Sequence, residues 1–479
     1  MAIPHISERP PNGDRRARSL GRVVWLTVSA LVGISVIPVV GFVVGTGLDP
    51  SWGLGFHMAR AQHLAFGRDI AWPFGPFAFV LVPTMAYPSS GLAACWLRLP
   101  VFAGVAALVS RKFIALARVP HDSPNLGARV ANGSAVGAAV LATVPTTWTL
   151  IGALGGSANI IVALYAMGAA FAVRALLTRE AVSERALVVA AITCGLGALA
   201  RFDTGVIGLG LALLVALQVR CSARSKLRSV AVVVGVFAAT VVFGWVALGQ
   251  PLGTFWGYLV TSFELGRGYG GGLAWSAHPS WTGPVVALCV LATLVCIGLS
   301  RAVRRPSVWA VIGCVGLAVT TAQQSLSRYD TGHIARAVCL CTALVVLFVC
   351  HRTIIVSALT LILCVLTMIS LNDSASPYPQ FGWPPRGEVP FVHPTTGLRY
   401  AWRTFDFTVS ASKRNARITR EHDRLGVLIG LPESVRAVIR GKSVHIEPWD
   451  CLWPGFMGGS GVRCRYLPPT KQTRHCWTA

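Results

Sequence analysis

Acidic residues are scarce in this sequence, and charge of either sign is sparse. Asp and Glu together number 18 of 479 residues, and charged residues of all kinds make up 13% of the chain. Hydrophobic residues make up 54%, which is outside the usual range of water-soluble domains. These proportions argue against a soluble enzyme and indicate an integral membrane protein.

Spacing motifs for metal, redox or nucleotide chemistry are also lacking. None of the 13 cysteines forms a CxxC pair, and most lie in apolar runs, where cysteine behaves as a small apolar residue. The glycine-rich run Gly266–Gly272 follows no strand pattern and precedes no GK[ST]. A nucleotide-binding loop is therefore disfavoured, and we expect a flexible outer loop there.

What the chain does contain is a series of apolar runs of about 20 residues, the length that spans a bilayer as a helix. The fold class predicted is an all-α polytopic membrane protein with about eleven transmembrane helices. The expected spans are 23–46, 91–109, 134–151, 158–177, 187–200, 206–219, 230–248, 283–299, 308–321, 335–350 and 354–371. The apolar segment 74–85 contains Pro76 and Pro83, which predicts a re-entrant or interfacial piece, and 249–282 is expected to be a long outer loop.

Charge sets the expected orientation. The basic N-terminus, residues 1–22, is predicted to be cytoplasmic, and every loop that then falls inside is also basic. The net charge of +24 is thus explained by loops that meet anionic lipid, not by nucleic-acid binding. This topology gives a multi-pass protein of the cell membrane with a spanning domain at 23–371, a first outer loop at 47–90, and a small extracytoplasmic α/β domain at 372–479.

The acids of the spanning region are not spread evenly. Five of them map to the predicted outer ends of spans: Asp49, Asp69, Asp203, Glu264 and Asp330. Basic residues lie close to most of these acids in the sequence: Arg68, Arg201, Arg267, Arg328 and His333. Charges near bilayer depth are costly unless they are paired or face a wet cavity, so this pattern favours a shared functional cavity. The alternative is a set of Arg–Asp pairs that only stabilise helix ends.

Two of these clusters have the same form, R-[FY]-D-T-G, at 201–205 and 328–332. Each segment follows an outgoing span, which predicts that Arg201 and Arg328 face one anionic group. His333 adds a donor that titrates near neutral pH. The alternatives are that the two R-[FY]-D-T-G segments are similar by chance and that His333 lies at the interface without a functional role.

Three segments resemble motifs of a family of poorly characterised multi-pass bacterial membrane proteins. FGRDIAWPFGPF at 66–77 is similar to that family's FGrDvvfTyGPlGF, SFELGRGY at 262–269 to SxEIxxGYs, and RYDTGH at 328–333 to RhDxGH. Their order and spacing agree over residues 20–335. From Cys451 onward the chain departs from the family pattern, as a shifted or truncated reading frame would make it do.

A weaker likeness, in architecture alone, is to C-class glycosyltransferases that use polyprenyl-phosphate sugars. It implies that Asp49 or Asp69 in the first outer loop is the catalytic base. The substrate-binding set would be Arg68, Arg201, Asp203, Glu264, Arg328, Asp330 and His333, with the guanidiniums on the lipid phosphate. No cofactor is expected, although the acids are compatible with a divalent cation. The partners are membrane lipid and the lipid-linked sugar donor, with no nucleic acid.

Two other classes of function stay open at this point. A transporter or flippase for a lipid-linked substrate would place polar groups near mid-membrane, where this chain has few. A non-catalytic membrane protein of the cell envelope would tolerate neutralisation of each acid in turn.

Overall fold

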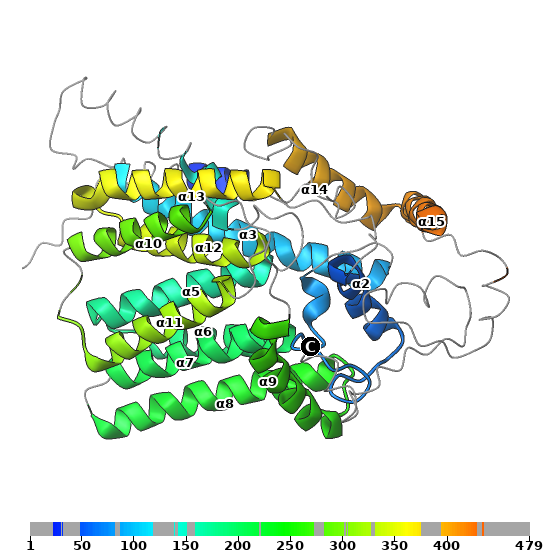
Figure 1. The fold of residues 1–479 in the computed structure, drawn as a ribbon, viewed down its shortest axis with the longest axis horizontal. Coiled ribbons are helices and arrows are strands. Elements are labelled where there is room, and N and C mark those ends of the chain that lie inside the picture. The colour runs from blue at the N-terminus through cyan, green and yellow to red at the C-terminus, as the bar shows by residue number, and fades with distance from the viewer. Residues whose placement is uncertain are drawn as a thin grey trace, which may run out of the picture.

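The computed structural model is nearly all helical in the part it describes (Figure 1). That part comprises residues 23–29, 31, 48–81, 87–117, 138, 142–150, 159–219, 222–272, 282–300, 303, 305–326, 331–374, 394–428 and 434. No strand occurs within these ranges; the β-pairing there consists of two isolated bridges, Phe66–Ile70 and Phe74–Arg201. The all-α prediction is confirmed for this part of the chain.

Long apolar helices run side by side and form the body of the molecule (Figure 1). They are α3 Pro88–Ala117, α5 Asn159–Thr178, α6 Glu184–Ala200, α7 Phe202–Val219, α8 Ala223–Ala247, α10 Thr282–Leu299, α11 Val308–Leu326, α12 Thr331–Phe348 and α13 Ile354–Ser374. Five segments are long and apolar enough to cross a membrane: 88–116, 161–178, 223–247, 308–325 and 351–370. Three shorter apolar helices lie at 202–218, 284–299 and 334–348.

The outer surface of this bundle carries large apolar side chains. Leu227, Phe243 and Ile355 are 71%, 75% and 73% exposed. In water such a surface would be unfavourable, whereas lipid tails solvate it well. The molecule is therefore built as a membrane protein.

Helix α5 lies at the centre of the bundle and α8 at its periphery. Of the α5 window 161–178, 61% is buried inside the protein, against 17% for the α8 window 223–247. The α5 face that packs inward includes Ala163, Ala166 and Ala170, each fully buried. Small residues let neighbouring helices approach closely, which is the usual means of helix association in lipid.

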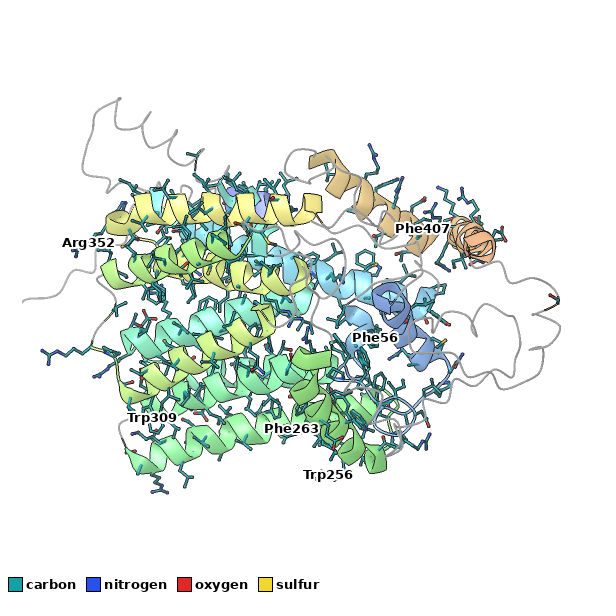
Figure 2. All side chains as sticks on the ribbon, in the orientation of Figure 1. Phe56, Trp256, Phe263, Trp309, Arg352 and Phe407 are labelled. Carbon is teal, nitrogen blue, oxygen red and sulfur yellow. The ribbon has the colours of Figure 1, made fainter. Side chains whose placement is uncertain are left out.

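Polar contacts at one end of the bundle join segments that the sequence assigns to the cytoplasm. Arg174, near the end of α5, pairs with Glu180 at 2.8 Å and donates to the Leu347 carbonyl at 2.9 Å. Arg228 of α8 pairs with Glu184 of α6 at 3.2 Å. Trp309 and Arg352 lie at this end, far from Phe56 and Phe407 (Figure 2). The predicted inner loops thus meet at one end.

The opposite end carries the segments predicted to be outside. Here lie α2 Leu48–Ala61, the short 3-10 helices η1 Ala78–Val80 and η2 Leu252–Thr254, and α9 Phe255–Gly272 (Figure 1). Helix α9 corrects the prediction of an extended loop over 249–282: its first part, FWGYLVTSFEL, is apolar but too short to stand out as a span. The glycine-rich run 266–272 forms the end of this helix, so the prediction of a flexible outer loop there is wrong.

Other expectations fall partly outside the described ranges. The predicted spans at 23–46 and 134–151 are helical at residues 23–29, 31, 138 and 142–150, and the segment 74–85 forms turns and η1 as far as Leu81. Within 372–479, α13 continues to Ser374, after which come α14 Pro394–Val409 and α15 Ala411–Leu428. The α/β character expected of that domain is not confirmed.

Candidate functional site

The first outer loop is docked on the junction between α6 and α7. The Phe202 amide donates to the Pro73 carbonyl at 3.0 Å, and the Phe77 amide donates to the Leu199 carbonyl at 3.0 Å. Gly75 is required between them, because a Cβ there would lie 2.3 Å from the Leu199 oxygen. The loop is thus fixed by backbone pairing.

The same loop is held from its other side by Gln250, which follows α8, and by α9. The Gln250 side chain accepts from the Phe66 amide at 2.9 Å and donates to the Leu64 carbonyl at 3.2 Å. Gly67 has φ +84° and packs so closely that a Cβ would lie 2.2 Å from the Tyr258 nitrogen. Only glycine satisfies both conditions without strain.

Helix α9 also bridges the loop to α6. The Tyr258 hydroxyl donates to the Ala198 carbonyl at 2.8 Å, and the Ser262 hydroxyl donates to the Trp72 carbonyl at 3.4 Å. Segments 66–77 and 262–269, which carry the first two family-like motifs, are therefore in direct contact.

Arg201 and Asp203 form a two-pronged ion pair at the start of α7. Arg201 Nε lies 2.8 Å from Asp203 Oδ1, and Nη2 lies 3.0 Å from Oδ2. The Thr204 amide also donates to Oδ1 at 2.8 Å. A carboxylate in the first turn of a helix is favoured by the helix dipole as well as by these donors.

Two residues from distant helices complete this cluster. Gln324 of α11 donates to Asp203 Oδ2 at 2.9 Å. Arg336 of α12 lies behind it, with Nη1 3.5 Å from Gln324 Oε1, and it interacts electrostatically with Asp203. We call Arg201, Asp203, Gln324 and Arg336 the junction cluster.

Aromatic groups enclose the junction cluster. The Arg201 guanidinium lies over the Phe74 ring at 5.2 Å, so the outer loop covers it. The hydroxyl of Tyr165 from α5 lies against Thr320 and Thr321 of α11 and interacts electrostatically with Asp203. The cluster therefore collects groups from α5, α7, α11, α12 and the outer loop.

Asp69 lies in a second ion pair, nearer the surface. It contacts Arg68 Nη2 at 2.9 Å and accepts from the Ala65 amide at 2.9 Å. The hydrogen bond to Asp69 and its charge raise the pKa of the Arg68 guanidinium above its ordinary value. The Arg68 side chain is 62% exposed, against 11% for Arg201, whereas Asp69 and Asp203 are similarly exposed at 31% and 30%, so the two pairs differ in the burial of their guanidiniums.

The remaining predicted residues are placed less fully. Asp49 lies in the first turn of α2, and His333 lies in the first turn of α12; their side chains lie outside the described part. Glu264 is exposed on α9. Arg328 and Asp330 fall in the gap 327–330, but Gln324 and Arg336 on either side of it reach the junction cluster.

Within the described ranges, no group of three or more His, Cys, Asp or Glu side chains is arranged to hold a metal ion. Several buried polar atoms near the cluster have no hydrogen-bond partner among the described residues, namely Trp72 Nε1, Tyr165 Oη, Thr321 Oγ1 and Ser325 Oγ. Native proteins leave few such atoms unsatisfied, and a ligand is one of the groups that can satisfy them. Chemically, the site offers fixed cations, amide and hydroxyl donors, and a partly exposed carboxylate.

Sequence reasoning missed Gln250, Gln324, Arg336, Tyr165 and Phe74. A signal was present for two of them. Gln324 lies just beyond the expected span 308–321, and Arg336 lies at the start of the expected span 335–350; at such positions a polar side chain needs a partner. Tyr165 and Phe74 had no such signal, because aromatic residues in apolar runs are usually core.

No family model matches this chain, and no curated protein and no solved structure matches it.

Proposed function

We propose that the chain is a multi-pass glycosyltransferase that moves a sugar from a polyprenyl-phosphate donor to a cell-envelope acceptor at the outer face of the cell membrane. The observation that supports this most is the docking of the first outer loop on the junction cluster. Docking places a carboxylate-bearing loop beside buried guanidiniums at one end of an apolar bundle. A transferase for a lipid-linked substrate needs a carboxylate and guanidiniums at the end of the bundle, where the lipid headgroups would lie.

In this proposal the two ion pairs have different tasks. The junction cluster and Arg328 with His333 attract the donor phosphate, since guanidinium forks suit phosphate oxygens. Asp69, which is partly exposed, or Asp49 takes the proton from the acceptor hydroxyl. Trp72 Nε1 and Ser325 Oγ would find partners in the bound substrate.

The proposed orientation puts the end with Arg174, Arg228 and Arg352 in the cytoplasm. Cationic loops are retained on that side during insertion. The chain would then cross the membrane about eleven times, with residues 1–22 inside and the small domain 372–479 outside.

The test is transfer of labelled lipid-linked sugar in membranes that contain Asp69→Asn or Asp49→Asn. We expect at least one of the two to lose activity by about 100-fold or more, as removal of a general base does. The matched control is Glu180→Gln, which removes an exposed acid of a similar ion pair at the other end. Full transfer by both variants would remove the chemistry proposed.

One observation favours a second candidate, a non-catalytic membrane protein. Two of the Arg201 nitrogens are already engaged by Asp203, as in a pair that only joins helices. On that reading Asp203→Asn reduces stability, and Asp69→Asn changes nothing that can be measured.

A further inference from the structure

Helix α14 presents two unlike faces. Thr404, which is 5% exposed, faces the bundle, and Thr408 Oγ1 accepts from Trp96 Nε1 of α3 at 3.2 Å. Phe407 packs with Cys95 and Leu92 of α3. Helix α14 is therefore attached along one side to a helix long and apolar enough to span the membrane.

Its other side is an uncovered apolar stripe. Leu398, Trp402, Phe405 and Val409 are 48%, 66%, 47% and 64% exposed. At about 100° per residue these four positions fall within about 60° of one another. The rings of Trp402 and Phe405 lie 5.7 Å apart, so they form one continuous surface.

Positive charge surrounds this stripe. Residues 394–428 contain seven Lys and Arg against three Asp and Glu. Arg399, Arg403 and Arg420 are exposed, as is Lys413, which is 63% exposed while it pairs with Asp406 at 2.8 Å. An apolar stripe with Trp and Phe, bordered by Lys and Arg, is the pattern of a helix that lies in a membrane interface.

The position of α14 fits the same partner. It meets α3 near the α3 N-terminus, where α3 exposes Trp96 and Leu97, each 43%. Figure 1 shows α14 and α15 at the end of the bundle that carries α2 and α9. Lipid that surrounds the exposed side of α3 would reach α14 at headgroup level.

We propose that α14 and α15 form a membrane-surface element that binds anionic phospholipid. The stripe inserts among the acyl chains next to the headgroups, and the Lys and Arg side chains contact the lipid phosphates, each adding to binding within a Debye length of the surface. This inference is independent of any transferase activity.

The test uses the full chain in nanodiscs of phosphatidylcholine, with and without phosphatidylglycerol. The photo-crosslinker p-benzoylphenylalanine replaces Trp402, which is 66% exposed, and in the matched control it replaces Asp406, one helical turn further along beside the stripe, whose side chain is 25% exposed. We expect several-fold more lipid adduct from position 402 than from position 406, and more still when phosphatidylglycerol is present.

A second pair of variants isolates the charge. Lys413→Glu with Arg420→Glu should abolish the gain from phosphatidylglycerol, whereas Arg305→Glu at the other end should keep it. Equal adducts at 402 and 406, crosslinking of 402 to another segment of this chain, or no dependence on phosphatidylglycerol would each overturn the proposal.

Discussion

Gln324 donates a 2.9 Å hydrogen bond to the carboxylate of Asp203, across 121 residues of sequence. The amide comes from the end of α11 and the acid from the start of α7. This contact, with Arg336 behind it, ties the second half of the bundle to the helix junction that carries the outer loop. The stability of the site therefore depends on both halves.

Neutralising Asp203 should destabilise the protein. Asp203→Asn removes the charge that balances Arg201, and we expect a loss of roughly 2–3 kcal/mol, less than for a fully buried pair because 30% of the side chain is exposed. The measurement is reversible unfolding in detergent. Asp406→Asn, which breaks an exposed pair on α14, is the control and should cost under about 1 kcal/mol.

Adding a methyl group between α6 and α7 should separate them. A Cβ at Gly205 would lie 2.3 Å from the Ala198 nitrogen, whereas one at Gly210 of the same helix meets nothing within 4 Å. We expect Gly205→Ala to lower the melting temperature clearly, while Gly210→Ala leaves it unchanged or raises it, since Ala is the better helix former. Equal effects would contradict the close packing.

The hydrogen bonds of Gln250 should hold the outer loop in place. In Gln250→Ala the Leu64 carbonyl and the Phe66 amide lose their partner, which costs about 1–3 kcal/mol if both stay buried. Limited proteolysis should then cut the loop faster. Gln323→Ala is the control, because Gln323 is an exposed neighbour of the junction cluster. Loop cleavage at the same rate in both variants would contradict this role of Gln250.

Cys350, at the basic end, should react more readily than the buried cysteines of the bundle. Partial burial alone would raise its pKa, but hydrogen bonds from Thr353 and the Arg352 backbone, with the Lys112 ammonium nearby, leave the pKa below its ordinary value. A lower pKa means more thiolate at a given pH, so alkylation should persist as the pH falls below the ordinary thiol value. Peptide mass spectrometry after iodoacetamide treatment measures this.

The partners of Cys350 provide the control. Lys112→Met should slow alkylation of Cys350 at neutral pH, while Arg305→Met should not. The buried Cys339, whose thiol lies inside the bundle, should stay unlabelled in every variant. Equal labelling of Cys339 and Cys350 would show that access, not pKa, controls the reaction.

Labelling from outside the cell should fix the orientation. Arg68→Cys lies on the docked loop and Arg305→Cys at the opposite end, and both native side chains are exposed. An impermeant maleimide should modify Arg68→Cys in intact cells and Arg305→Cys only after permeabilisation. The reverse result would invert the proposed topology.

Hydropathy and charge were sufficient to predict the helical class and most helix positions, because a bilayer span depends on the length of an apolar run. The pattern could not predict α9, whose apolar part is short and mixed with Ser, Thr and Glu. It identified Arg201 and Asp203 as a pair because the two residues are close in the sequence. It could not identify Gln250 or Gln324, since those contacts depend on how distant helices pack.

A single residue, Arg201, separates α6 from α7. The two helices therefore have no flexible linker between them. We expect them to enter the bilayer together as one hairpin during synthesis. Its tip would carry Arg201 and Asp203 across as a mutually neutralised couple, which is far less costly to translocate than either ion alone. A nascent chain that ends at Ala200 should accordingly fail to insert α6 stably, and one that ends beyond Val219 should succeed.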